Sequence, residues 1–235
     1  MIYNYLIYFF LFAGVLFSIV TRKLTIWAAL LGSIMGLLVF KGGGYNGFIS
    51  LGIFFILGST ATSFGLKKKQ EIGAADKSTS RRTAGQVIAN GGAAAILGAA
   101  AWYNPALIHL MQLMMAGSLA AATADTLSSE AGTVLGKNFY NIITLKKEER
   151  GLDGVISIEG TLTGVVGSLI IASVYSIGHD WNNELLWIVI AGTFGNIFDS
   201  ILGATLESAH LIGNNLVNFL NTCIGAAVCL LLFYL

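Results

Sequence analysis

The stretch that decides the fold is "PALIHLMQLMMAGSLAAATADTLSSEAGTVLG", which runs from Pro105 to Gly136. Residues 105–124 are mostly apolar, and about 20 such residues make a helix long enough to cross a bilayer. Asp125 and Glu130 follow directly, among several hydroxyl side chains. The stretch therefore predicts a membrane-spanning helix that ends in acids and hydroxyls.

The composition of the whole chain agrees with this interpretation. Of its 235 residues, 55% are hydrophobic and only 11% are charged, and the mean hydropathy is +0.76. A soluble globular domain carries about 25% charged residues. We therefore expect an all-α, polytopic integral membrane protein, whose 29 glycines suit close helix–helix contact in lipid. The net charge of +1 gives no indication of partners, and we expect no nucleic-acid partner.

The chain contains about eight windows of membrane-spanning character, and we expect one membrane domain over residues 1–235. The first window lacks a basic start and a small-residue cleavage site, so we interpret it as a span rather than a removed signal peptide. The windows are 2–20, 24–40, 46–66, 84–102, 105–124, 155–178, 185–206 and 215–235.

The basic residues predict the orientation of these spans. Twelve of the 13 Lys and Arg residues follow the first, third or fifth window, and Lys41 is the exception. Cytoplasmic loops carry such an excess of positive charge. We therefore expect a multi-pass protein of the cell membrane with both termini outside, and a polar site that faces the cytoplasm.

Three acids stand out as candidates for a site. Asp125 and Ser129 are four residues apart on one helical face, and Glu130 joins them only if the helix breaks near Gly132. Such oxygen ligands suit Mg²⁺, although the same groups could cap a helix end in interfacial water. Asp199 lies inside an apolar window, where a carboxylate is costly and by default marks a functional site.

Other polar groups fall near the same ends of the spans. Arg82, Gln86 and Asn90 form a stripe at helical spacing in "RTAGQVIANGG", suited either to contacts between helices or to phosphate binding. The run Lys67–Lys69 favours contacts with anionic lipid headgroups, and a phosphate-binding cluster is the alternative. The chain has no Walker loop and no HExxH or CxxC pattern. We expect the three histidines to be scattered and incidental, and Cys223 and Cys229 to be ordinary packing residues.

Five motifs in order resemble those of the integral membrane family called domain of unknown function 92. They are "RTAGQVIANGG", "ADTLSSEAGTVLGK", "GLDGVISIEGT", "DSILGATLE" and "NNLVNF", within residues 67–221. The family includes transmembrane protein 19 and the plant phytyl-phosphate kinases, and is distantly similar to dolichol-kinase-type enzymes that use CTP.

The resemblance implies a prenyl-phosphate kinase. Such an enzyme transfers a phosphoryl group from a nucleoside triphosphate, CTP being favoured, to an isoprenoid monophosphate held in the lipid bilayer, with Mg²⁺ as cofactor. It would have Asp125, Glu130 and Asp199 as metal ligands and catalytic groups, joined by Asp153. The implied substrate- and nucleotide-binding residues are Lys67, Lys69, Arg82, Gln86, Asn90, Ser129, Lys137, Ser200, Glu207, Asn215 and Asn218.

Two other functions stay open on the sequence alone. A membrane transporter or lipid carrier would also use an acid at membrane depth such as Asp199. A CTP-dependent lipid cytidylyltransferase would share the metal, the nucleotide and the membrane location. The polar loop 137–150 suits either a lid or a short hairpin. The kinase hypothesis requires that Asp125 and Asp199 reach one shared pocket.

Overall fold

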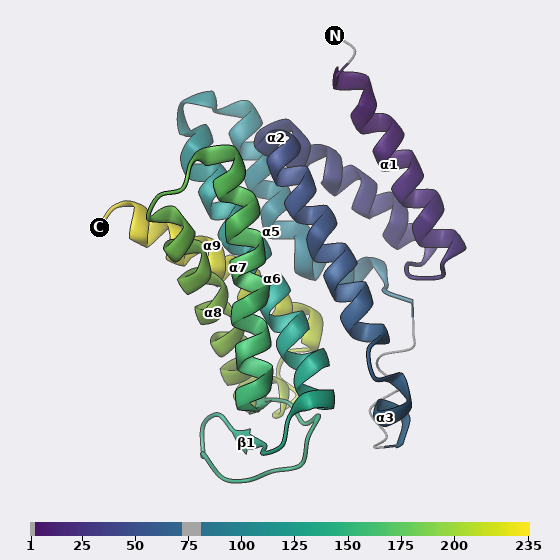
Figure 1. The fold of residues 1–235 in the computed structure, drawn as a ribbon, viewed down its shortest axis with the longest axis vertical. Coiled ribbons are helices and arrows are strands. Elements are labelled where there is room, and N and C mark those ends of the chain that lie inside the picture. The colour runs from purple at the N-terminus through teal and green to yellow at the C-terminus, as the bar shows by residue number, and fades with distance from the viewer. Residues whose placement is uncertain (1–2, 72–80) are drawn as a thin grey trace.

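The computed structural model describes residues 3–71 and 81–235 (Figure 1), so Lys77, one of the residues behind the predicted orientation, lies outside the described residues. Within these ranges the chain is helical apart from one short hairpin. The helices are α1 (Tyr3–Val20), α2 (Ile26–Ser63), α3 (Leu66–Glu71), α5 (Ala84–Tyr103), α6 (Ile108–Leu135), α7 (Ile158–His179), α8 (Glu184–Leu202) and α9 (Asn214–Phe233). The 3₁₀ turn η1 (Pro105–Leu107) leads into α6, the π-helical turn η2 (Gly203–Glu207) ends α8, and β1 (Tyr140–Asn141) pairs with β2 (Val155–Ile156).

The described residues contain six helices that are long and apolar enough to cross a membrane, and α1 adds a shorter apolar helix. The longest of them, α2, is sharply kinked at Gly44, whose φ of 58° and ψ of −155° favour glycine. The kink divides α2 into two arms that pack side by side, since Gly36 on the first arm lies against Phe48 and Leu51 on the second. When the two arms of α2 are counted separately, the described residues form eight apolar helical segments, as the sequence predicts. The structure confirms a polytopic helical membrane protein.

Helix α6 lies at the centre of the bundle and packs against α2, α5, α7, α8 and α9. It can do so because its buried segment, 115–124, consists mainly of small residues. A Cβ added at Gly117 would lie 2.6 Å from the Gly225 carbonyl oxygen of α9, and one at Gly42 would lie 2.2 Å from that of Gly98. These helices therefore meet at backbone contact, as small residues permit in membranes.

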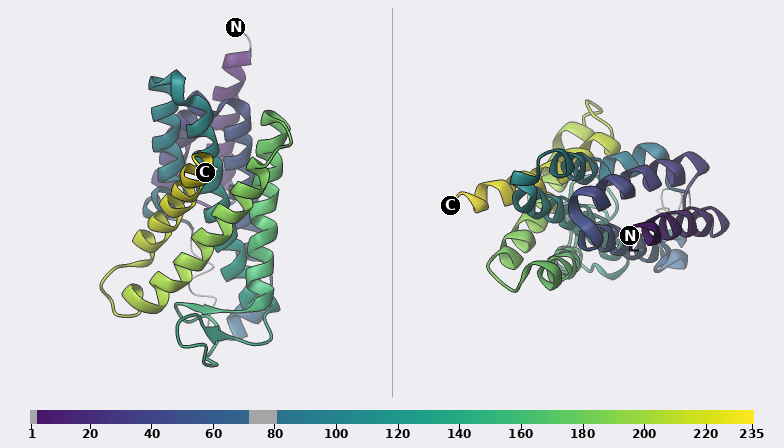
Figure 2. Two further views of the ribbon diagram at one scale, coloured as in Figure 1. Left: turned by 90° about the vertical axis from the view of Figure 1, so that its left-hand side faces the viewer. Right: turned by 90° about the horizontal axis from the view of Figure 1, so that it is seen from above.

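One end of the bundle, which we call the loop end, carries α3, η2 and the β1–β2 hairpin (Figures 1 and 2). The described ends of the chain are directed toward the opposite end of the bundle (Figure 2). An even number of membrane-crossing segments requires both ends to lie on the same side. At the loop end, the backbone of Arg82 is fixed to the α1–α2 connection. Its N–H donates to the Lys23 carbonyl oxygen at 3.0 Å, and its carbonyl accepts from the Thr25 N–H at 3.1 Å. The side of the membrane that the loop end faces stays a prediction.

Candidate functional site: an acidic cavity at the loop end

A cavity of about 650 Å³ lies among the helix ends at the loop end. Its polar lining comes from α2, α3, α5, α6, α8, α9 and the hairpin region. Among the described residues that line it, five are acids and two are cationic: Asp125, Glu130, Asp153, Asp199 and Glu207, with Lys69 and Arg82. This acidic cavity therefore favours cations, and an anionic ligand requires a cation with it.

The acidic cavity brings together the two acids that the sequence places near membrane depth. The side chains of Asp125 on α6 and Asp199 on α8 lie within hydrogen-bonding reach of each other. Asn221 on α9 also donates from Nδ2 to Asp199 Oδ2, at 3.4 Å. Two carboxylates in contact repel each other unless a proton or a cation lies between them. The expected shared pocket is present, and the assignment of its acids as metal ligands stays a prediction.

Glu130 has different partners. Its Oε2 lies 2.6 Å from Lys69 Nζ, and its Oε1 accepts from Thr62 Oγ1 at 2.8 Å. Lys69 is 1% exposed, and its ammonium group also donates to the carbonyl oxygens of Ala61 and Thr62, at 3.0 and 3.3 Å. Lys69 thus satisfies carbonyl groups at the C-terminal end of α2, and Glu130 neutralises it.

This ion pair changes the predicted metal site. In the part of the chain that the structure describes, no three His, Cys, Asp or Glu side chains are grouped so that they could hold a metal ion. Lys69 holds Glu130 while the two aspartates lie together, and the assignment of Asp125, Glu130 and Asp199 as metal ligands stays a prediction. The same contacts occupy all three donors of Lys69, so it could bind a phosphate only by releasing a protein acceptor.

Arg82 provides the other cation of the acidic cavity. Its guanidinium carbon lies 5.7 Å from the centre of the Phe54 ring. Gly58 makes room for it, since a Cβ there would lie 2.7 Å from Arg82 Nη2. Burial lowers the pKa of the Arg82 guanidinium from its usual value, and the negative charges of Glu130 and Asp125 oppose that shift. An arginine stays protonated in proteins, so Arg82 presents a fixed positive charge.

Gln86 and Asn90 follow Arg82 along the first turns of α5. The capping box of α5 uses Gln86 Oε1, which accepts from the Thr83 N–H at 2.9 Å. Asn90 Nδ2 donates to the Gln86 carbonyl oxygen at 3.0 Å, while Asn90 Oδ1 is buried without a hydrogen-bond partner among the described residues. These contacts leave Gln86 Nε2 and Asn90 Oδ1 as the groups that could bind a ligand. A buried polar atom without a partner calls for such an explanation.

The segment after α6 forms a wall of the acidic cavity. Tyr140 pairs with Ile156, and Asn141 pairs with Val155, in a short antiparallel hairpin, whose second strand lies beyond the polar loop 137–150. Gly154, with φ of 75°, lies against η2, where a Cβ would come within 2.3 Å of the Ala204 Cβ. This contact joins the hairpin to the turn that carries Glu207. Single π-helical turns of this kind are frequent at functional sites.

The other predicted site residues divide into two groups. Ser129, Ser200 and Asn218 line the acidic cavity. Lys67, Lys137 and Asn215 are exposed and do not line it. Their predicted role in substrate binding stays untested.

Sequence reasoning missed several polar residues of the lining. These are Thr62, Thr126, Ser157 and Asn196. The clearest sequence signal for one of them is the spacing of Asn196, which lies three residues before Asp199 in the same apolar window. A buried amide there is as unusual as the acid beside it.

A second polar network lies at the opposite end of the bundle. Glu184 lies 2.7 Å from His109 Nε2 and accepts from the Tyr175 hydroxyl at 3.0 Å. The ring of His179 stacks on Tyr175 and lies 2.8 Å from Gln112 Oε1. The prediction of scattered histidines is therefore wrong for His109 and His179, whose ring centres are 6.2 Å apart.

The family can now be identified by comparison with known proteins. The family described as integral membrane protein DUF92 matches residues 9–226. The chain belongs to the DUF92 family. It is an integral, multi-pass membrane protein, as the family description and the six apolar helices both indicate.

Three relatives of the chain come from very different organisms. The uncharacterized membrane protein sll0875 of Synechocystis sp. is 31% identical over 210 residues, which cover 88% of this chain and 81% of the relative. The uncharacterized membrane protein MJ0933 of Methanocaldococcus jannaschii is 35% identical over 212 residues, 86% of this chain and 82% of the relative. Protein VTE6, chloroplastic, of Arabidopsis thaliana is 31% identical over 206 residues, 85% of this chain but only 62% of the longer relative. No solved structure matches the chain.

Proposed function

We propose that this DUF92 protein is a prenyl-phosphate kinase. It transfers a phosphoryl group from CTP or another nucleoside triphosphate, with Mg²⁺, to an isoprenoid monophosphate, and gives the diphosphate. The family resemblance implies this activity. The observation that carries the proposal is the pair of Asp125 and Asp199, in contact within an acidic cavity that also contains Arg82.

The acid pair fits Mg²⁺ without a third acid. This ion usually keeps several waters and is bound through one or two carboxylates and the phosphates of the substrate. Asp125 and Asp199 supply two carboxylates from separate helices, and Asn221 holds the second in place. When bound, the ion neutralises charge on the donor phosphates. It also explains how an anionic nucleotide enters a cavity with an excess of acids.

The remaining groups of the acidic cavity bind and align the two phosphates. The Arg82 guanidinium can donate to phosphate oxygens in bidentate fashion, and Gln86 Nε2 adds a neutral donor from the next helical turn. An oxygen of the acceptor monophosphate forms a bond to the γ-phosphorus as the bond to the β,γ-bridging oxygen breaks. The nucleoside diphosphate leaves. Because the acceptor oxygen is already an anion, no general base is required.

The transporter alternative is less favourable in this structure. The acidic cavity and the histidine network lie at opposite ends of α6, α7 and α8. Between them along these helices lies a core whose members Leu113, Leu119, Ile171 and Ile188 are fully buried. A polar substrate would have to cross this apolar layer. The lipid cytidylyltransferase alternative uses the same groups and differs in its product.

The test offers CTP labelled on the γ-phosphate to the purified protein, with Mg²⁺ and geranylgeranyl or phytyl monophosphate. We expect the label in a prenyl diphosphate, with CDP as the other product, and no transfer by the Asp125→Asn variant. Release of pyrophosphate instead of CDP would identify a cytidylyltransferase. No product from folded protein, across several prenyl chains and nucleotides, would contradict the proposal.

A further inference from the structure

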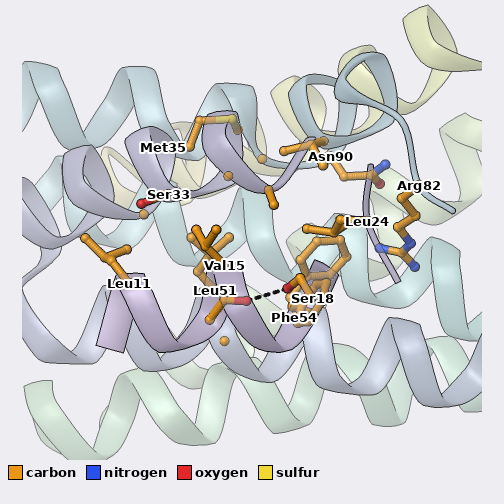
Figure 3. Close-up of a pocket in the computed structure, with 18 of the residues that line it drawn as sticks. Leu11, Val15, Ser18, Leu24, Ser33, Met35, Leu51, Phe54, Arg82 and Asn90 are labelled. Carbon is orange, nitrogen blue, oxygen red and sulfur yellow. Dashed lines mark hydrogen bonds between the residues drawn. The ribbon is translucent and has the colours of Figure 1, made fainter. Parts of the chain in front are cut away.

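A second cavity, of about 180 Å³, lies among α1, both arms of α2 and α5 (Figure 3). Most of its lining is apolar, with Leu11, Val15, Met35, Leu51 and Phe54 among its walls. An apolar cavity of about 150 Å³ is enough to hold a benzene molecule. This apolar cavity therefore has room for roughly one five-carbon isoprene unit, and is too small for a long lipid chain.

The apolar cavity and the acidic cavity share three residues. Arg82, Gln86 and Asn90 line both of them. In Figure 3, Arg82 and Asn90 stand at one end of the apolar cavity, while Leu11 and Ser33 stand at the other. A molecule that occupies both cavities must then be apolar in one part and anionic where it passes Arg82. The unpartnered Asn90 Oδ1 lies at this same boundary.

The apolar cavity also has a route to the lipid. A Cβ added at Gly14 or at Gly52 would meet nothing within 4 Å, although both glycines line the cavity. Gly14 and Phe10 on α1 are exposed at the surface of the bundle. Helix α1 lies at the edge of the bundle and packs mainly against α2 (Figures 1 and 2). These glycines thus leave a gap through which a chain could pass into the bilayer.

We propose that the apolar cavity binds the isoprene unit next to the phosphate of the acceptor lipid. The phosphate lies between Arg82 and Gln86 at the boundary with the acidic cavity, and the rest of the tail leaves past Gly14 and Gly52. This inference rests on the proposed kinase activity and adds the determinant of acceptor specificity. The protein selects the first isoprene unit, while the length of the tail beyond it has little effect on binding.

The test maps the bound tail directly, by a measurement that does not depend on catalysis. The probe is a geranylgeranyl monophosphate analogue with a photoreactive diazirine in its first isoprene unit, added to the protein in nanodiscs. We expect crosslinks to residues of α1, α2 and α5 that line the apolar cavity. Crosslinks confined to α7, α8 or α9 would overturn the inference.

Variants that fill the apolar cavity provide a second readout. Gly14→Leu and Gly52→Leu place a side chain in the gap between the cavity and the bilayer, so we expect crosslinking to fall at least tenfold. Ala227→Leu, on the exposed face of α9, adds the same side chain elsewhere and should leave crosslinking unchanged. Undiminished crosslinking in both glycine variants would contradict the inference. It would also be contradicted if an excess of bilayer phospholipid competed with the probe as strongly as unlabelled geranylgeranyl monophosphate does.

These outcomes separate the inference from the kinase proposal. Crosslinks in the apolar cavity without any transfer of phosphate would leave the lipid site in place and remove the kinase activity. If both glycine variants transfer phosphate with wild-type crosslinking and an unchanged KM for the acceptor, the kinase activity stands and the lipid site in the apolar cavity is wrong.

Discussion

The Asp199→Asn substitution should stabilise the metal-free protein while it removes activity. Asp199 lies within hydrogen-bonding reach of Asp125 and receives a hydrogen bond from Asn221. Two unit charges at a hydrogen-bonding separation of about 3 Å repel each other by about 5.5 kcal/mol at an effective dielectric constant near 20. That value is an upper limit on the gain, because a proton shared by the pair already relieves part of the repulsion. Asparagine keeps the shape and can donate to Asp125.

The same substitution should abolish the response to Mg²⁺. A ligand at a hundred times its Kd stabilises the protein that binds it by about 2.7 kcal/mol. The wild-type protein should show a rise in Tm on addition of saturating Mg²⁺, and the variant should show almost none. Loss of a charge-stabilising group from an active site typically lowers kcat by about a hundredfold or more, and we expect a loss of at least this size.

The assay is thermal unfolding of the detergent-solubilised protein with and without Mg²⁺. Glu149→Gln serves as the control, because it neutralises an exposed carboxylate outside the acidic cavity and should alter neither the Tm nor the response to Mg²⁺. A metal-free Tm below that of the wild type would refute the argument from repulsion. An undiminished Mg²⁺ response in Asp199→Asn would refute the assignment of the acid pair as the ion site.

Three further predictions concern the packing and the phosphate site. Lys69→Met should lower the free energy of unfolding by about 3 kcal/mol in denaturant titrations, because it removes the cation that pairs with Glu130. Addition of Glu130→Gln should restore part of this loss, and the absence of any restoration would count against the ion pair. Gly42→Ala should lower the free energy of unfolding by at least about 2 kcal/mol in thermal unfolding, because its Cβ would meet backbone atoms. Gly52→Ala should change the free energy of unfolding by no more than about 0.5 kcal/mol, and equal effects of the two substitutions would disprove the close packing of α2 on α5. Arg82→Lys should raise the KM for the acceptor monophosphate about tenfold in steady-state kinetics, since an ammonium group cannot reproduce the guanidinium fork, and an unchanged KM would exclude Arg82 from phosphate binding.

The sequence predicts the spans well because each of them is long and apolar. The kink of α2 at Gly44 falls in the gap between the second and third predicted windows, where the run "KGGG" interrupts the apolar residues. The position of Asp199 inside an apolar window also pointed to the cavity, because an unpaired carboxylate at that depth is costly.

Contacts between distant segments could not be predicted in this way. Lys67 and Lys69 look equivalent in the sequence, yet Lys67 is exposed and Lys69 is buried beside Glu130. The difference arises because Lys69 contacts the carbonyl groups at the end of α2 and Glu130 on α6. His109 and His179 meet for a similar reason, through the packing of α6 against α7. Neither arrangement leaves a local signal in the sequence.

The position of the bound ion tests the account most directly. Crystals of the protein grown with Mn²⁺ in place of Mg²⁺ and a non-hydrolysable CTP analogue would show the ion by its anomalous scattering. We expect a peak that contacts the carboxylates of both Asp125 and Asp199 and an oxygen of the triphosphate. A nucleotide-bound ion held elsewhere, with neither aspartate among its ligands, would contradict it.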